Sequence, residues 1–258
     1  MNLETRLLEE KAYSLLSNSE LEDAFKLFRR AAELYRSQGN HKQAALCFAS
    51  AGSCWSKKSG EKNFHNAAVS YFKSATEAEK GGDYEYASLL YKHAAVNYER
   101  DGEYQDFSNC FYRSKESYRK FLIYRLIHPK KIQPFVESIE SKGIKGAIKR
   151  FFSWLVLTFS YILWGHGERP SRTFFSSILV VCLSAFLYTL GSLLKAGAVI
   201  KPDFLESFYF SIVTFTTLGY GDITPLGFSK LVAGVEAFSA LFIMPLFVIG
   251  LTRKYLRV

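Results

Sequence analysis

Seven consecutive residues, TTLGYGD from Thr216 to Asp222, combine hydroxyl side chains, two glycines and a carboxylate. Glycine permits left-handed backbone torsions at Gly219 and Gly221, so that successive carbonyl oxygens of this stretch can turn to one side. If four chains surround an axis, these carbonyl oxygens stack in rings that can replace the hydration shell of a cation. The Thr217 hydroxyls would add the innermost ring. These residues therefore favour the coordination of a dehydrated cation by backbone oxygens.

Residues suited to covalent or metal chemistry are not arranged for it in the sequence. The pair His65 and Asn66 and the scattered serines form no nucleophile arrangement. The cysteines show neither a CxxC motif nor the spacing of zinc ligands, which predicts reduced structural thiols: Cys47, Cys54, Cys110 and Cys182. We therefore expect no enzymatic activity and no cofactor.

Two long apolar stretches enclose the TTLGYGD residues. The stretch from Thr173 to Leu194 carries no charge, and the stretch from Leu231 to Thr252 carries only Glu236. About 20 apolar residues are enough for a helix to cross a bilayer. We therefore expect two transmembrane helices, over 173–194 and 231–252, within a membrane module of residues 173–258.

A short helix is expected between the two spans. Asp203 stands at an N-cap position with Glu206 three residues later, and an apolar run follows. A helix over 203–216 is too short to cross the membrane, so it should dip into the bilayer and return. Its C-terminal end presents partial negative charge, which favours a cation. Residues 217–221 must then form irregular backbone at membrane depth, which is tolerated where it lines an aqueous path.

The charge pattern places the N-terminal half in the cytosol. The N-terminal residues, MNLETRLLEEKAYSLL, mix charge into an amphipathic pattern and do not form a signal peptide. Basic residues precede the first span and follow the second, so both termini should be cytoplasmic in a multi-pass protein of the cell membrane. We assign the excess of 33 Lys plus Arg over 24 Asp plus Glu to the membrane surface and not to nucleic acid. The side chains expected to contact anionic headgroups are Lys142, Lys145, Lys149 and Arg150.

The stretch from Thr217 to Gly221, TLGYG, resembles the selectivity-filter signature of potassium channels, usually written TVGYG. The order of span, short helix, filter and span is similar to the two-transmembrane channel family, over about residues 170 to 252. The resemblance implies a homotetramer that conducts K⁺ passively, with the 203–216 segment as the pore helix. The residues that would hold K⁺ are Thr217, Leu218, Gly219 and Tyr220. Two alternatives stay open: a nonselective cation channel, and a membrane-anchored interaction protein whose pore conducts poorly.

The sequence departs from the family pattern at two positions. Leu218 stands where valine is usual, and its side chain should point behind the filter, so that coordination by its carbonyl oxygen is retained. Val213 leaves no carboxylate where some family members pair one with the aspartate after GYG. Asp222 then needs another partner, for which Tyr209 is the candidate. The residues expected to support the filter are Thr216, Asp222 and Glu236.

Glu236 is the one ionisable residue within the two predicted spans. Such a residue is costly in a membrane and usually functional. We expect its carboxylate to bond the back of the pore helix, with Thr214 or Thr216 as the partner. Direct binding of an ion in the cavity is the alternative, which costs more because the carboxylate would face the axis unpaired.

The second span should line the inner cavity below the filter. Leu241, Met244 and Val248 recur at spacings of three and four, so one helical face presents them together as a hydrophobic constriction. Pro245 removes a backbone donor within this helix and is either a gating hinge or a proline that the helix tolerates. Gly250 adds a second soft point.

A basic linker of residues 126–172 precedes the first span. Its apolar part, residues 151–164, is too short for a comfortable crossing, so we expect an interfacial helix with its tryptophans near the headgroups. The GHGERP residues that follow make the turn into the membrane, and their GERP part resembles the segment before the first span of some prokaryotic two-span channels. His166 within this turn is a plain turn residue or a pH sensor.

The N-terminal half repeats the pattern Ala-x3-aromatic-x2-Ala. Copies begin at Ala24, Ala44, Ala68, Ala87 and, with Phe in the first place, Phe107. The triplets QGN, GGD and DGE lie between copies as helix stops. Small and large side chains on one face suit closely packed antiparallel helices, and two helices give a unit of about 40 residues. The pattern resembles tetratricopeptide repeats, especially their SNAP-like variant.

The predicted fold class is an all-α membrane protein. It joins a two-helix pore module with a re-entrant pore helix and filter to an N-terminal α-helical solenoid. The solenoid, residues 1–125, should stay in the cytosol, bind a protein partner or ligand or assemble chains, and modulate the pore.

Overall fold

The computed structural model describes residues 3–58, 63–128 and 144–255. The chain divides into two compact units. We call Met1–Tyr161, with Arg257–Val258, the helical unit, and Ile162–Leu256 the membrane unit.

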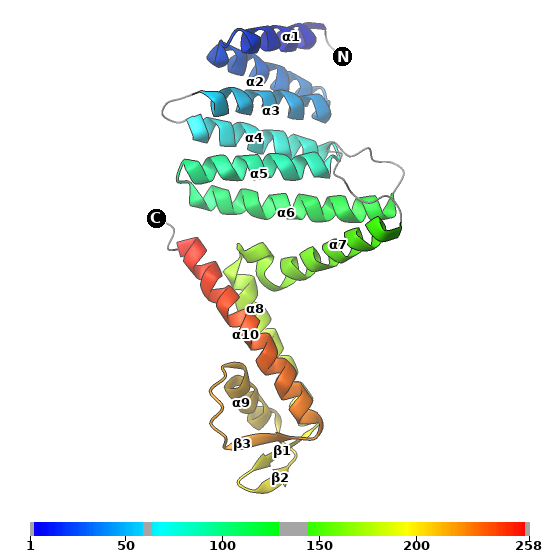
Figure 1. Cartoon of the computed structure of the whole chain (residues 1–258), viewed down its shortest axis with the longest axis vertical. Coiled ribbons are helices and arrows are strands. Elements are labelled where there is room, and N and C mark those ends of the chain that lie inside the picture. The colour runs from blue at the N-terminus through cyan, green and yellow to red at the C-terminus, as the bar shows by residue number, and fades with distance from the viewer. Residues whose placement is uncertain (1–2, 59–62, 129–143, 256–258) are drawn as a thin grey trace. The chain divides into compact units, whose positions relative to one another are not determined.

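The helical unit consists of consecutive helices, which Figure 1 shows stacked in chain order from α1 to α6. Its helices are α1 (Leu3–Ser17), α2 (Leu21–Ser37), α3 (His41–Lys57), α4 (Asn63–Lys80), α5 (Tyr84–Arg100), α6 (Tyr104–Ile127) and all but the last turn of α7 (Ile144–Trp164). From α1 to α6, each helix packs mainly against its neighbours in the sequence. A helical N-terminal region is therefore confirmed, whereas the tetratricopeptide or SNAP-like type of repeat stays a prediction.

The turns between these helices lie at the helix ends that were predicted from the sequence. Gly39, Gly82 and Gly102 adopt positive φ angles of 72°, 79° and 80°, which end one helix in a left-handed residue. Asn40 and Asp83 then begin the next helix, and each side chain accepts a hydrogen bond from the backbone N–H three residues later. Each turn is therefore specified locally, by a glycine followed by a capping side chain.

The repeated pattern marks the buried face of the helices. In the copies that begin at Ala24, Ala44 and Ala87, both alanines and the aromatic residue between them are buried. The copy that begins at Phe107 is more open, because Phe107 and Phe111 are only half-buried. Alternating small and large side chains thus lets neighbouring helices approach closely while aromatic rings fill the space between them.

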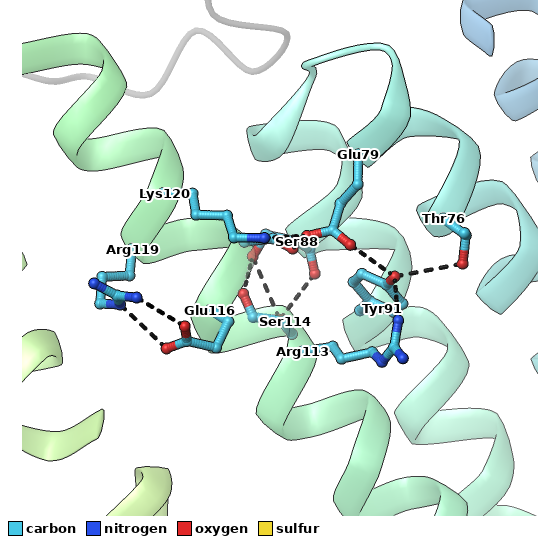
Figure 2. Close-up of polar contacts among 10 residues, drawn as sticks. Thr76, Glu79, Ser88, Tyr91, Arg113, Ser114, Glu116, Arg119 and Lys120 are labelled. Carbon is cyan, nitrogen blue, oxygen red and sulfur yellow. Dashed lines mark hydrogen bonds and ion pairs between the residues drawn. The ribbon is translucent and has the colours of Figure 1, made fainter. Parts of the chain in front are cut away.

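Polar contacts also join the last three helices of this stack, as Figure 2 shows. The Glu79 carboxylate on α4 accepts hydrogen bonds from Tyr91 on α5 at 3.0 Å and from Ser117 on α6 at 2.8 Å. Ser88 on α5 and Ser114 on α6 each donate to the backbone carbonyl of the other. Because these groups are partly buried and paired, they fix how α4, α5 and α6 meet.

Helix α7 begins at Ile144, seven residues before the apolar segment predicted over 151–164. Lys145, Lys149 and Arg150 lie within it, because charged residues on one face do not interrupt a helix that is apolar on another. Lys142 lies outside the described residues. The helix exposes Phe152 and Phe159 and is not among the helices that satisfy the length and hydropathy of a membrane span. Its place at the membrane interface stays a prediction.

The membrane unit contains α8 (Pro170–Thr189), β1 (Ser192–Lys195), β2 (Ala198–Ile200), α9 (Phe204–Phe215), β3 (Ile223–Leu226) and α10 (Phe228–Tyr255), after a single 3₁₀ turn, η1 (Gly165–Gly167). In the described residues, α8 and α10 are the two helices long and apolar enough to cross a membrane. They pack against each other and against α9 (Figure 1). The all-α membrane class is confirmed, with the addition of a small sheet.

That sheet was not predicted, and it corrects the end of the first span. The strands lie in the order β2-β1-β3, all antiparallel, with Leu193 opposite Ile200 on one side and Pro225 on the other. Helix α8 therefore ends at Thr189 and not at residue 194, because the apolar residues after Gly191 pair as a strand. Helix α10 extends past both ends of the predicted 231–252 span.

Candidate functional site

Helix α9, the predicted pore helix, is held at its start by the expected cap. The Asp203 carboxylate accepts a hydrogen bond from the backbone N–H of Glu206 at 2.8 Å. The Glu206 carboxylate pairs with Lys195 of β1, which ties this end of α9 to the sheet. The cap and the ion pair together fix where the helix begins.

Apolar packing holds α9 between the two long helices. Phe210 lies in a buried cluster with Tyr188 of α8 and Val232 of α10. Phe215, at the other end of α9, packs with Val181 of α8 and residues of α10. The C-terminal end of α9 is therefore fixed at a defined point, and the TLGYG residues start there.

Left-handed backbone torsions occur at every second residue of the TLGYG stretch. Thr217, Gly219 and Gly221 have positive φ angles of 59°, 57° and 79°, whereas Leu218 and Tyr220 between them do not. The positive φ values at Gly219 and Gly221 confirm the prediction made from glycine alone. The value at Thr217 was not predicted, because a β-branched residue rarely adopts it. Such an outlier persists only where the surroundings fix it, and it commonly marks a functional site.

Backbone hydrogen bonds join the start of this stretch to the end of α9. The N–H groups of Thr217 and Leu218 donate to the carbonyls of Thr214 and Val213, each at 3.1 Å. The Thr216 hydroxyl donates to the carbonyl of Ile212 at 2.7 Å, so it closes the last turn of the helix. Thr216 therefore supports the stretch through the helix end.

The remaining TLGYG residues are open in a single chain. Leu218 and Tyr220 are 59% and 67% exposed, and a Cβ built on Gly219 or Gly221 would meet nothing within 4 Å. Large side chains exposed in this way commonly mark surfaces that contact other molecules.

The Asp222 carboxylate after the TLGYG stretch has the partner that the sequence suggested. The Tyr209 hydroxyl, on α9, donates a hydrogen bond to it at 2.9 Å. The stretch is thus anchored at both ends to the same helix: at its start by backbone bonds and at its end by this side-chain pair.

Glu236 lies behind α9 in a buried network. Glu236 is 1% exposed. Its carboxylate accepts hydrogen bonds from Tyr188 of α8 at 2.6 Å and from Ser211 of α9. The Ser211 hydroxyl also lies 2.9 Å from the carbonyl of Val181. The expected bond to the pore helix is present, but it involves Ser211 and not Thr214 or Thr216. Glu236 thus joins α8, α9 and α10 at one point.

The predicted inner-pore residues are exposed in the single chain. They are Leu241, Met244 and Val248, and apolar residues on other faces of α10 are exposed as well. The helix runs without interruption through Pro245. A helix that exposes apolar side chains on several faces must be covered by lipid or by other copies of the chain.

The C-terminal end of α10 contacts the turn before α8. Glu168 in this turn is buried and pairs with Arg253 of α10, with 3.6 Å between Oε1 and Nη1. Gly250 approaches Pro170 closely: a Cβ built on Gly250 would lie 3.3 Å from the Pro170 Cβ. The sequence reading singled out the GHGERP turn but did not find these partners.

Two signals in the sequence could have pointed to the missed residues. A carboxylate within a span requires hydroxyl donors, and Ser211 and Tyr188 are polar groups within apolar helices. Likewise, Glu168 is an acidic residue among basic ones, next to a span whose partner span ends in Arg253. In both cases the sequence indicates that the carboxylate needs a partner, but it does not identify the partner.

Comparison with known proteins assigns this site to a class. Residues 175–257 match the family model described as "Ion channel". This segment, which holds α9, the TLGYG stretch, most of α8 and all of α10, is therefore similar to ion-channel domains.

One relative that matches part of this chain is described as "Potassium channel subfamily T member 1" from Gallus gallus, and it is 36% identical over 86 residues. The match covers 31% of this chain and 7% of the relative, so the chain spans a small fraction of that protein's length. No solved structure matches the chain.

Proposed function

We propose that the chain is the subunit of a homotetrameric, potassium-selective channel, with residues 217–221 as its selectivity filter. The observation that carries the proposal is the alternation of left-handed residues at Thr217, Gly219 and Gly221. When residues with positive and negative φ alternate, successive peptide groups turn the same way, so their carbonyl oxygens can all face one side and line an ion path. K⁺ passes through passively, held by oxygens of Thr217, Leu218, Gly219 and Tyr220, and no other cofactor takes part.

Four copies are proposed because one chain supplies only one side of such a lining. The exposed Leu218 and Tyr220 side chains and the exposed apolar faces of α10 would be covered when copies meet around an axis. The face with Leu241, Met244 and Val248 would then line the inner cavity. The similarity to a protein described as a potassium channel supports K⁺ as the permeant ion.

The test is ion flux through the purified protein in liposomes. We expect K⁺ flux that exceeds Na⁺ flux and that Ba²⁺ blocks, from protein whose native mass is that of four chains. Equal K⁺ and Na⁺ flux would support a nonselective cation channel, and no flux from intact tetramers would support the interaction protein with a poorly conducting pore.

A matched pair of glycine variants ties the flux to the filter. Gly219 and Gly197 both have positive φ, 57° and 81°, and both have open space around a built Cβ. Gly219→Ala should abolish K⁺ flux, whereas Gly197→Ala, in the turn between β1 and β2, should carry the same backbone strain and keep the flux. Full K⁺ flux in Gly219→Ala would show that this stretch is not the filter.

The remaining features extend the proposal to the membrane and the helical unit. Both termini would face the cytoplasm, and Lys142, Lys145, Lys149 and Arg150 would contact anionic headgroups. We propose no contact with nucleic acid. The helical unit would bind a protein partner or ligand and modulate the gate, by a difference in affinity between the closed and open states.

Deletion of residues 1–122 tests this last role. If the truncated chain forms tetramers that open with the same probability as the full chain, across lipid compositions and pH values, the helical unit does not modulate the gate.

A further inference from the structure

The turn before α8 is unusual in its backbone. Gly165, His166 and Gly167 follow one another with positive φ angles of 54°, 58° and 85°. A Cβ built on Gly165 would lie 2.7 Å from the Cβ of Arg169, so the turn tolerates no side chain there. A non-glycine residue held in this conformation is strained, and the strain persists only where the surrounding contacts fix it.

The turn brings Glu168 to the inner end of α10. The Glu168 side chain is 3% exposed and pairs with Arg253 at 3.6 Å. This separation is longer than a charge-assisted hydrogen bond, so the two groups attract each other electrostatically but are not hydrogen-bonded. A carboxylate removed from water is stable only while it has a partner, and it regains its hydration if the partner and the covering helix move away.

A second contact lies on the same face of α10. Gly250 and Arg253 are three residues apart, which places both on one side of the helix. Gly250 is buried against Pro170, and a side chain on Gly250 would hold α10 away from the start of α8. Movement of this end of α10 away from α8 would therefore break the close backbone approach and the ion pair together.

We propose that Glu168, Arg253, Gly250 and Pro170 form a latch within each subunit that is closed in one gating state and open in the other. This inference rests on the proposed function. Both contacts of α10 lie beyond Pro245 and on the inner side of the constriction formed by Leu241, Met244 and Val248. A change in the width of that constriction requires this end of α10 to move, and the latch opposes the movement. Glu168 is a positioning residue, because it acts on the pore through α10.

The two arrangements of the latch are each stable and their intermediates are not. In one, the carboxylate is buried and paired; in the other, both charged groups are hydrated. An arrangement in which Arg253 has left and Glu168 is still covered would bury an unpaired charge. Such a contact switches between two states and does not deform gradually, which is the behaviour that a gate requires.

The experiment compares weakening the latch with locking it. Glu168→Gln removes the charge and should change the ratio of open to closed time in single-channel recordings by about tenfold or more. Arg253→Gln should change the ratio in the same direction, and the double variant should change it no further than the larger single effect. Lys254→Gln, with the same loss of charge at the adjacent position, is the control and should leave the ratio unchanged.

Locking uses Pro170→Cys together with Gly250→Cys in a chain without its native cysteines. The 3.3 Å Cβ separation built from the structure is close to the spacing of about 3.8 Å found in disulfides. The oxidised pair should shift the ratio in the direction opposite to Glu168→Gln, and reduction should reverse the shift. A lock that leaves gating unchanged would overturn the latch, as would charge variants that gate like the control.

These outcomes are separate from those that test the channel itself. If the unmodified protein shows no selective K⁺ flux, the proposed function fails. If it conducts K⁺ selectively while both the charge variants and the lock gate normally, only the latch is wrong. Should Glu168→Gln fail to form tetramers, the disulfide pair, which retains Glu168, still decides between these outcomes.

Discussion

Replacement of Glu236 tests whether its carboxylate supports the pore helix or binds ions. Glu236→Leu leaves the buried Tyr188 hydroxyl without the acceptor that now lies 2.6 Å away. Ser211 is affected less, because the carbonyl of Val181 lies 2.9 Å from its hydroxyl. A buried hydroxyl that loses its partner costs about 1–3 kcal/mol. We therefore expect Glu236→Leu to destabilise each subunit by about that amount.

Glu236→Gln should be much milder, because its amide can satisfy both neighbours. The amide oxygen can accept from Tyr188, while the amide nitrogen can donate to Ser211, whose own proton goes to Val181. A network that needs only hydrogen bonds then keeps its shape, and we expect a loss below about 1 kcal/mol. The two variants remove the same charge but differ in how many hydrogen bonds remain.

Two measurements on the reconstituted protein decide the matter. Denaturation of the tetramer should rank the stability as unmodified, then Glu236→Gln, then Glu236→Leu. The unitary K⁺ conductance should be the same in Glu236→Gln and in the unmodified protein. If Glu236→Gln lowered the conductance as much as Glu236→Leu, the charge itself would matter, and direct binding of an ion by Glu236 would replace the supporting role.

Three further predictions follow from described contacts. Tyr209→Phe removes the 2.9 Å bond to Asp222, so the outer end of the filter should lose about 0.5–1.5 kcal/mol of support, seen as faster decay of K⁺ current during steady recording; an unchanged decay would assign Asp222 no role there. Ser37→Cys, an exposed position in a chain without native cysteines, should react with an impermeant thiol reagent only from the cytosolic side; labelling of intact cells would reverse the predicted topology. Burial raises the pKa of the Cys47 thiol to about 12 and that of Cys54 to about 11, so a thiol titration of the folded protein at pH 8 should find both unreactive until denaturant is added. Since the unfolded thiols ionise near pH 9 and the folded ones do not, the stability of the helical unit should also fall as the pH rises above that value; constant stability through that range would contradict the burial argument.

Local features of the site could be predicted from the sequence because short-range geometry determines them. The Asp203 cap, the left-handed glycines at 219 and 221 and the pairing of Asp222 with Tyr209 all join residues of one helix and the stretch beside it. The helix stops at Gly39, Gly82 and Gly102 are of the same kind. A cap or a positive φ depends on a few residues, and their types are visible in the sequence.

Features that depend on packing between distant segments could not be predicted. The apolar residues from Leu193 onwards suited a longer helix, and only their pairing with 223–226 makes them a strand. Glu236 plainly needed hydroxyl partners, but the rotation of α8 and α9 selects Ser211 and Tyr188. Glu168 and Arg253 lie at opposite ends of the membrane unit's sequence, so nothing local connects them.

The small sheet has a mechanical consequence for the two long helices. Strand β1 follows α8, β3 precedes α10, and the two strands pair from Ser192 with Leu226 to Lys195 with Ile223. The C-terminal end of α8 and the N-terminal end of α10 are thereby held together, and this end of the helix pair can serve as a pivot. Helix α10, with 28 residues, is a lever about 42 Å long. A tilt of about 10° at the pivot would displace the C-terminal end of α10 by about 7 Å, while residues next to the pivot would scarcely move. In the proposed channel, a large movement at the C-terminal end of α10 is thus compatible with a nearly rigid structure at the end that the sheet holds.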